Sequence, residues 1–146
     1  MMIDTTQMKV ASLDKLADSL GEKVVVRGWV RNKRDSKAII FVEVRDGSGF
    51  VQAVVSLEDA GQEAFDTAKS LSLETSVILS GTVVADERQV GGCELAVEAV
   101  QIVQQPAEDY PLGKKAHGVE FLANKRHLWL RSKKQWAIMR IRNRAK

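Results

Sequence analysis

The stretch of residues 38–45 alternates between apolar and polar side chains, with the period of two that a β-strand imposes. Ile40, Val42 and Val44 fall on one face, because successive side chains of a strand point to opposite sides of a sheet. Phe41 falls on the other face, among charged residues. This pattern predicts a strand that covers a hydrophobic core on one side and keeps an aromatic ring on its outer side.

Similar alternation recurs elsewhere in the chain, and apolar residues at helical spacing occur in two segments. A turn at Asp46-Gly47 separates two of the strands. We expect Ser12 to cap the first helix and Ser56 to cap the second, where Asp59 completes a pattern resembling a capping box. The predicted strands are residues 23–33, 38–46, 50–56, 75–85 and 93–103, and the predicted helices are residues 12–20 and 56–69.

Three strands, a helix and two strands, in this order, are typical of the OB fold. This is an all-β domain, a five-stranded Greek-key barrel with a helix between strands three and four, whose outer face over strands two and three binds oligonucleotides. We expect the barrel in residues 1–105. Residues 106–134 are predicted to form an irregular connector, interrupted by Pro106 and Pro111, and residues 135–146 to begin another helix.

The composition, 45% hydrophobic and 28% charged, is that of a soluble globular chain. No apolar run approaches the roughly 18 residues of a membrane span, and the N-terminus lacks the features of a signal peptide, so we expect a cytoplasmic location without membrane contact. Cys93 is the single cysteine, and His117 and His127 have no partners at ligand spacing. The sequence therefore predicts neither an internal disulfide nor a metal site.

Charge is distributed unevenly along the chain. Residues 114–146 contain eleven Lys and Arg and one acidic residue, Glu120, whereas residues 1–113 contain eleven Lys and Arg and eighteen Asp and Glu. The last segment therefore has a formal charge of +10 and the rest of −7. A basic segment of this kind is either a solvated surface or the binding surface for a polyanion.

The outer side of the predicted second and third strands has the groups that an unpaired nucleobase needs. Phe41 offers a flat apolar ring for stacking. Gln52, on the third strand, offers both a donor and an acceptor to the edge of a base. A basic run precedes them and suits the phosphates. Its members are Arg27, Arg31, Lys33 and Arg34.

Each of these residues also has a purely structural interpretation. Phe41 could be covered by a loop or by the first helix, Gln52 could be solvated, and the basic run could be an ordinary hairpin surface. Trp29 fits either the packing of the barrel or its surface. The convergence of several residues on one face is what favours nucleic-acid binding.

No pattern in the chain predicts catalysis. There is no glycine-rich phosphate loop with a lysine, no nucleophile motif and no Cys/His set. The carboxylates of Asp35, Glu43 and Asp46, near the predicted hairpin, are interpreted as solvated or salt-bridged charges. The sequence thus favours a binding domain over an enzyme.

The same segments resemble a known family, the anticodon-binding barrel of the class IIb aminoacyl-tRNA synthetases, which comprises the aspartyl, asparaginyl and lysyl enzymes. The resemblance extends from about residue 13 to residue 143, and in the connector it is specific for bacterial asparaginyl enzymes, because the others usually differ at residues 127–131. The segments that carry it are residues 28–35, 40–47, 51–53, 110–118, 120–122, 126–132 and 137–143.

The resemblance implies a role for individual residues. Phe41 would stack on the middle anticodon base, a uridine, and Gln52 would contact the edge of that base. Arg34 would help to hold the anticodon loop, and Glu94 would lie near the first anticodon base. The implied function is binding of the tRNA(Asn) anticodon loop, with the sequence GUU.

The resemblance also implies that most of the parent enzyme is missing. Residues 135–146 would be the start of a catalytic domain whose motifs 2 and 3 bind ATP, Mg²⁺ and the amino acid, so we expect no cofactor and no adenylate formation in this chain. The parent would be a homodimer. The fragment would be a monomer, or would associate weakly through Trp136, Met139 and Ile141.

Three alternatives remain open on the sequence. The chain could be the anticodon module of an aspartyl-type synthetase, which differs in the third anticodon base. It could be a general single-strand-binding OB domain. It could also be an interaction domain that keeps the barrel but binds no RNA.

Overall fold

The computed structural model of the chain describes residues 2–113 and 115–145. The chain divides into two compact units, Met1–Tyr110 and Pro111–Lys146.

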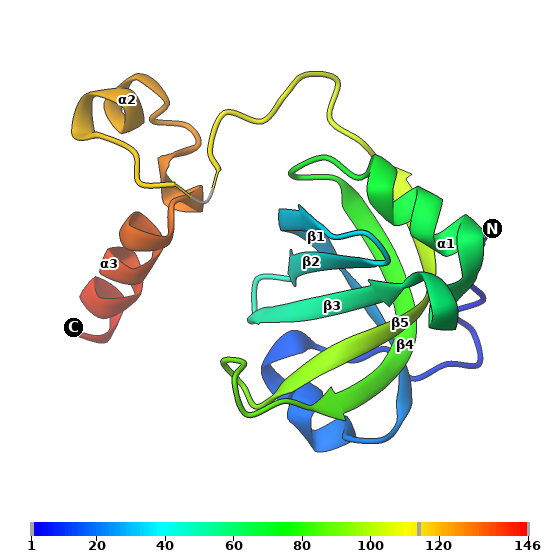
Figure 1. The fold of residues 1–146 in the computed structure, drawn as a ribbon. Helices are drawn as coiled ribbons and strands as arrows, with labels where there is room; N and C mark the ends of the chain where they lie inside the picture. The colour runs from blue at the N-terminus through cyan, green and yellow to red at the C-terminus, as the bar shows by residue number, and fades with distance from the viewer. Residues whose placement is uncertain (1, 114, 146) are drawn as a thin grey trace. The chain divides into compact units, whose positions relative to one another are not determined.

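The first unit is a closed barrel in which the strands are ordered β1-β2-β3-β5-β4 (Figure 1). Neighbouring strands are antiparallel except β3 and β5, which run parallel and are in register at Ala53 with Leu95 and at Val54 with Ala96. The predicted five-stranded OB fold with a helix after the third strand is therefore confirmed. Its elements are η1 (Leu13–Ser19), β1 (Lys23–Asp35), β2 (Ile39–Arg45), β3 (Phe50–Ser56), α1 (Leu57–Ser70), β4 (Ser76–Ala85) and β5 (Cys93–Gln104).

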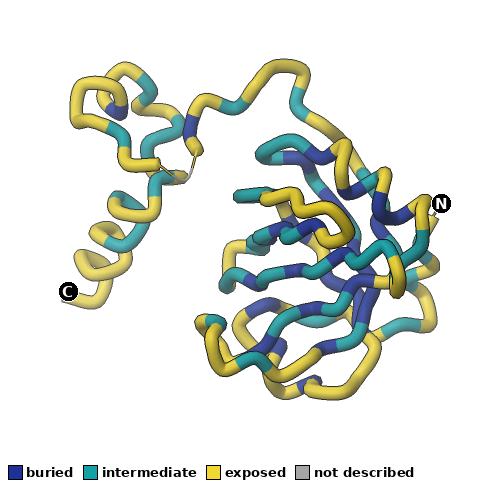
Figure 2. Tube along the Cα trace, in the orientation of Figure 1, coloured by how far each residue is buried: buried dark blue, intermediate teal, exposed yellow. Residues whose placement is uncertain are grey.

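Buried apolar residues of the strands form the core of the barrel. Figure 2 shows buried residues recurring along the strands. In β2, Ile40, Val42 and Val44 are fully buried, while the residues between them are half-buried. Each such side chain contributes about 1.5–3 kcal/mol to folding when it leaves water. Helix α1 packs against β2, β3 and β5 and adds Phe65 and Ala68 to the core. The predicted alternation is thus confirmed, with Phe41 outside the core.

The predicted helix caps are wrong. Neither Ser12 nor Ser56 makes a side-chain capping hydrogen bond. Asp46, in the β2–β3 turn, instead accepts a hydrogen bond of 2.9 Å from the backbone N–H of Leu13, the first residue of η1. Burial raises the pKa of the Asp46 carboxyl, but hydrogen bonds from Ser48, Leu13 and Gly49 outweigh this effect and leave the pKa below its usual value. A carboxylate distant in sequence therefore replaces the local cap.

Strand β1 is longer than predicted, and it contains a β-bulge. Val30 lies opposite Val44, but the next paired residue, Asn32, lies opposite Glu43, so Arg31 is the extra residue. A bulge of this kind shifts the alternation of side chains by one position. After the bulge, Asn32 and Arg34 lie on the outer side of the barrel and Lys33 lies opposite the buried Val42.

Two glycines allow the backbones of neighbouring strands to approach closely. A Cβ atom on Gly81, in β4, would lie 2.1 Å from the carbonyl oxygen of Ala96 in β5, and one on Gly28 would lie 2.4 Å from that of Arg45. The pairing of β4 with β5 shifts register between Ser80 and Gly81. Glycine at such a position permits the bend that closes a barrel.

Among its described residues, the second unit contains two short helices within residues 106–134, where the sequence predicted an irregular connector, and one longer helix that corresponds to the helix predicted from residue 135 onwards. These elements are α2 (Val119–Asn124), η2 (Trp129–Arg131) and α3 (Lys133–Arg144). Arg126 lies over the ring of Trp129, with its Cζ 4.2 Å from the centroid, and Arg140 lies over Trp136 at 4.7 Å. Helices of six and three residues give too little periodicity to be recognised in a sequence. Within the described ranges, no helix combines the length and the apolar character needed to cross a bilayer.

Candidate nucleic-acid interface

The outer side of β1, β2 and β3 brings together Arg34, Phe41 and Gln52, three of the residues that the sequence assigned to nucleic-acid binding. We call this surface the β1–β3 face and define it by Arg34, Phe41, Glu43 and Gln52. Phe41 is half-buried, and Arg34 lies directly opposite it on β1. The guanidinium carbon of Arg34 is 4.5 Å from the centroid of the Phe41 ring, a cation–π contact. The ring therefore lies at the surface, beside a cation.

Gln52 lies on β3, between β2 and β5. On one side it is directly opposite Glu43 of β2. On the other side, its Nε2 atom donates a hydrogen bond of 3.3 Å to Oε2 of Glu94 in β5. The structure places Phe41, Gln52 and Glu94 on the outer side of β2, β3 and β5, respectively, and their contacts with bases stay predictions.

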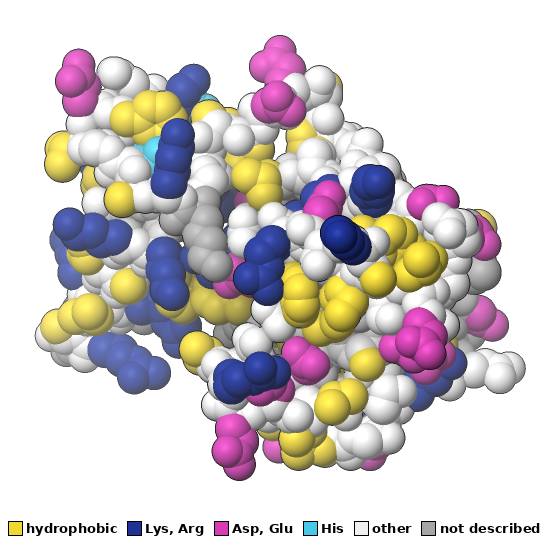
Figure 3. All heavy atoms as spheres, in the orientation of Figure 1, with side chains coloured by type: hydrophobic (Ala, Val, Ile, Leu, Met, Phe, Trp, Pro, Cys, Tyr) yellow, Lys and Arg dark blue, Asp and Glu magenta, His cyan; other side chains and the backbone are white. Residues whose placement is uncertain are grey.

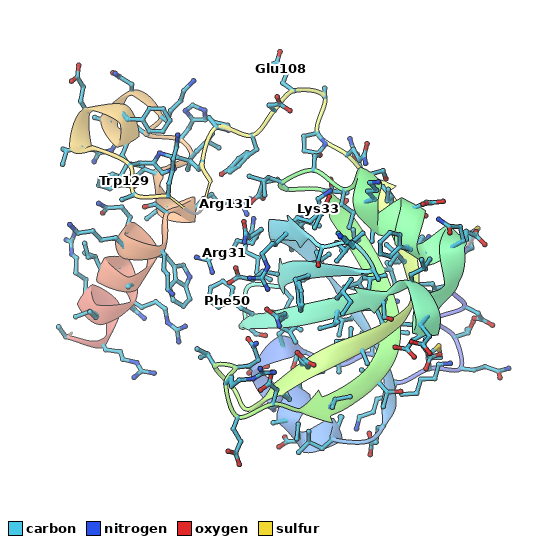
Figure 4. All side chains as sticks on the ribbon, viewed as in Figure 1. Arg31, Lys33, Phe50, Glu108, Trp129 and Arg131 are labelled. Atoms are coloured by element: carbon cyan, nitrogen blue, oxygen red, sulfur yellow. The ribbon has the colours of Figure 1, made fainter. Side chains whose placement is uncertain are left out.

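A second pairing of an arginine with a ring lies on the same side of the barrel. The Cζ atom of Arg31 is 4.3 Å from the centroid of the Phe50 ring, and its Nη1 donates a 3.0 Å hydrogen bond to Glu43 (Figure 4). Phe50 and Gln52 are two residues apart on β3 and therefore share a side of the strand, but the sequence analysis did not assign Phe50 to the site. This spacing of two residues was the signal in the sequence that could have assigned Phe50 to the site.

The sequence left open whether Trp29 packs in the barrel or lies on its surface. The structure places it at the surface, with 43% of its area exposed. Arg45 lies 5.5 Å from its ring centroid and forms an ion pair with Glu74. Tyr110 lies near this pair. Its burial, followed by the negative charge of Glu74, raises the pKa of the phenol to about 12, although Arg45 acts in the opposite direction.

Arg27 and Lys33 do not join the β1–β3 face as defined above. Arg27 is exposed and lies opposite Ile78 of β4, in the part of β1 that is not paired with β2. Lys33 is directed towards α1, because the bulge at Arg31 reverses the alternation. Its Nζ donates to the backbone carbonyl of Lys69, in the last turn of α1, and lies 3.6 Å from Asp35 (Figure 4).

Replacement of Lys33 by alanine should therefore affect the fold more than the binding of RNA. The Lys33 side chain is only 19% exposed, and its ammonium stabilises the negative end of the α1 dipole. We expect Lys33→Ala to lower the free energy of unfolding by about 1 kcal/mol, measured by urea denaturation. Lys37→Ala is the matched control, since it removes the same charge from an exposed residue of the β1–β2 turn. Equal stability of the two variants would contradict this placement.

The charges of the β1–β3 face are mixed, and hydrophobic side chains lie among them at the surface of the barrel (Figure 3). Arg31 is paired with Glu43, whereas Arg34 is held over a ring. Among the described residues, no three His, Cys, Asp or Glu side chains are grouped so as to hold a metal ion. This chemistry suits stacking, hydrogen bonding and phosphate contact.

Comparison with known proteins agrees with this arrangement. The family described as "tRNA_anti-codon: OB-fold nucleic acid binding domain" matches residues 24–103, more than half of the chain. The asparagine–tRNA ligase of Symbiobacterium thermophilum is 48% identical over 136 residues, which are 93% of this chain and 31% of that protein. The asparagine–tRNA ligase of Deinococcus deserti is 43% identical, with coverage of 92% and 30%. The chain thus spans under a third of the length of these curated relatives.

Solved structures show the same relationship. The asparaginyl-tRNA synthetase of Pyrococcus horikoshii, crystallised with asparaginyl-adenylate, superposes with a TM-score of 0.78 at 36% identity. The match covers 92% of this chain and 32% of the Pyrococcus chain. OBody AM1L10, solved bound to hen egg-white lysozyme, gives a TM-score of 0.59 at 25% identity, with coverage of 66% of this chain and 95% of its own. The family match, which contains the whole β1–β3 face, shows that the chain belongs to the tRNA anti-codon family of OB-fold nucleic acid binding domains.

Proposed function

We propose that this domain binds the anticodon loop of tRNA(Asn), with the sequence GUU, as the tRNA-recognition module of an asparaginyl-tRNA synthetase. The observation that carries the proposal is the pairing of a surface ring, Phe41, with a neighbouring carboxamide, Gln52, on one side of the barrel. The similarity to asparagine–tRNA ligases supports the choice of asparagine over aspartate.

Each group of the β1–β3 face has a separate task in this proposal. The ring of Phe41 stacks on the central uridine, a contact worth about 1–3 kcal/mol. The amide of Gln52 forms hydrogen bonds with the edge of that base. Arg34 leaves the ring when the base arrives and contacts the phosphate backbone, which makes the affinity dependent on salt.

The proposal is confined to binding. The resemblance places ATP and Mg²⁺ in the catalytic domain of a full synthetase, and the proposal assigns no catalytic group and no cofactor to this chain. We expect its partner to be the tRNA.

The test is the affinity of the chain for RNA stem-loops, measured by fluorescence anisotropy. A GUU loop should bind more tightly than a GCU loop by at least about 1 kcal/mol, or roughly 5-fold. The logarithm of the affinity should fall with the logarithm of salt concentration by about 0.7 for each phosphate that is neutralised. Tighter binding of a GUC loop than of a GUU loop would indicate the aspartyl-type alternative. Equal binding of every loop, together with effective competition by poly-U, would instead identify a general single-strand-binding domain.

A further inference from the structure

We infer that Glu94 is a positioning residue that holds the amide of Gln52 in one orientation and thereby makes the β1–β3 face selective for uracil over cytosine. The inference rests on the proposed function and deepens it. It assigns to Glu94 a role in reading the base that stacks on Phe41, in addition to the proximity to the first anticodon base that the family resemblance implies.

The geometry begins with the short parallel pairing of β3 and β5. Because Ala53 is in register with Leu95, the preceding residues on the same outer side, Gln52 and Glu94, are brought next to each other. Nε2 of Gln52 lies 3.3 Å from Oε2 of Glu94, and both side chains are partly buried. An ionised carboxylate only accepts hydrogen bonds, so the NH₂ group of the amide must be the one that faces Glu94. The carbonyl oxygen of Gln52 therefore faces away from Glu94.

The other carboxylate beside Gln52 is engaged elsewhere. Glu43 lies directly opposite Gln52 on β2, and in principle it could attract the same NH₂ group. Its Oε1, however, accepts a hydrogen bond of 3.0 Å from Arg31, and that guanidinium is in turn stacked on Phe50. The ion pair with Arg31 leaves Glu94 as the carboxylate that orients the amide.

A fixed amide distinguishes two bases that a rotating amide would accept equally. At the adjacent 4 and 3 positions, uracil presents an acceptor, O4, and a donor, N3–H, whereas cytosine presents a donor, the N4 amino group, and an acceptor, N3. A bidentate pairing of Gln52 with one base therefore requires its amide to be turned by half a rotation relative to the pairing with the other. Because Glu94 holds the amide in one orientation, Gln52 can pair with uracil but meets mismatched groups on cytosine. This mismatch lowers the affinity for cytosine about 5- to 150-fold.

The experiment compares GUU and GCU stem-loops for the 146-residue chain and two variants. Glu94→Gln keeps the size of the side chain, but its amide both donates and accepts and so allows either orientation of Gln52. Glu98→Gln is the matched control, because Glu98 lies on the same strand, is paired with Lys23, and loses the same charge.

We expect the unmodified chain and Glu98→Gln to prefer GUU by about 10-fold or more, and Glu94→Gln to reduce this ratio to within about 3-fold, mainly by gaining affinity for GCU. An unchanged ratio in Glu94→Gln, or an equal change in affinity for both loops, would overturn the positioning role while leaving the proposed function intact. Absence of a GUU preference in the unmodified chain would instead overturn the proposed function, and the inference with it.

Discussion

Replacing Gly81 by alanine should destabilise the barrel by about 3 kcal/mol, because the added methyl group would collide with backbone rather than with a side chain that can move. The new Cβ would lie 2.1 Å from the carbonyl oxygen of Ala96 and 2.9 Å from the Cα of Val97. Relief of this clash requires β4 and β5 to separate where their pairing shifts register. The hydrogen bonds on both sides of the shift would then be weakened.

Urea and thermal unfolding, followed by circular dichroism, measure this effect. For a domain of this size, a loss of 3 kcal/mol corresponds to a fall in Tm of about 12–24 °C. Gly113→Ala is the control, since a Cβ atom there meets nothing within 4 Å and the backbone is not in a left-handed conformation. A Tm for Gly81→Ala within a few degrees of that of the control would contradict the close approach of β4 and β5 at this position.

Replacing Phe41 by alanine should weaken binding of the GUU stem-loop by about 1–3 kcal/mol, or roughly 5- to 150-fold. The variant loses the surface on which the central base stacks, and it also loses the ring that holds Arg34 in place. Phe41→Tyr retains a ring of the same size and should bind within a few-fold of the unmodified chain. Anisotropy titrations at a single salt concentration provide the comparison.

A loop without a base at its central position separates stacking from every other effect of the substitution. The unmodified chain and Phe41→Ala should differ less in affinity for this abasic loop than for the GUU loop, because the stacking contribution is then absent from both and only the other effects of the substitution remain. Since Phe41 is half-buried, the unfolding free energy of the variant must also be measured to show that the barrel is intact. A loss of affinity that persists undiminished with the abasic loop would refute the stacking role.

The parts of the fold that could be predicted are those that depend on local periodicity. In β2 and β3, the alternation of Val42 and Ala53 with Phe41 and Gln52 identified both the core and the outer surface. The order of strands and helix then indicated the barrel. Such patterns are visible in a sequence because each side chain's direction is set by its neighbours along the same strand.

The parts that could not be predicted depend on contacts between distant segments. The bulge at Arg31 directed Lys33 towards α1, and nothing in the basic run itself marks the position where the pairing slips. The first amide of η1 is satisfied by Asp46, more than thirty residues away, and not by the adjacent Ser12. The contact between Gln52 and Glu94 likewise exists only because β3 and β5 meet.

The parallel junction of β3 and β5 also has a mechanical consequence. β3 and β5 are paired at only two positions, whereas β4 and β5 are paired along the whole of Ser76–Ala85, so the β3–β5 junction has the shorter backbone pairing. The hydrogen bond between Gln52 and Glu94 links the two strands at this junction. A nucleotide bound to both side chains would add a further link between the strands. Because a ligand stabilises the state to which it binds, RNA binding would then stabilise the closed barrel.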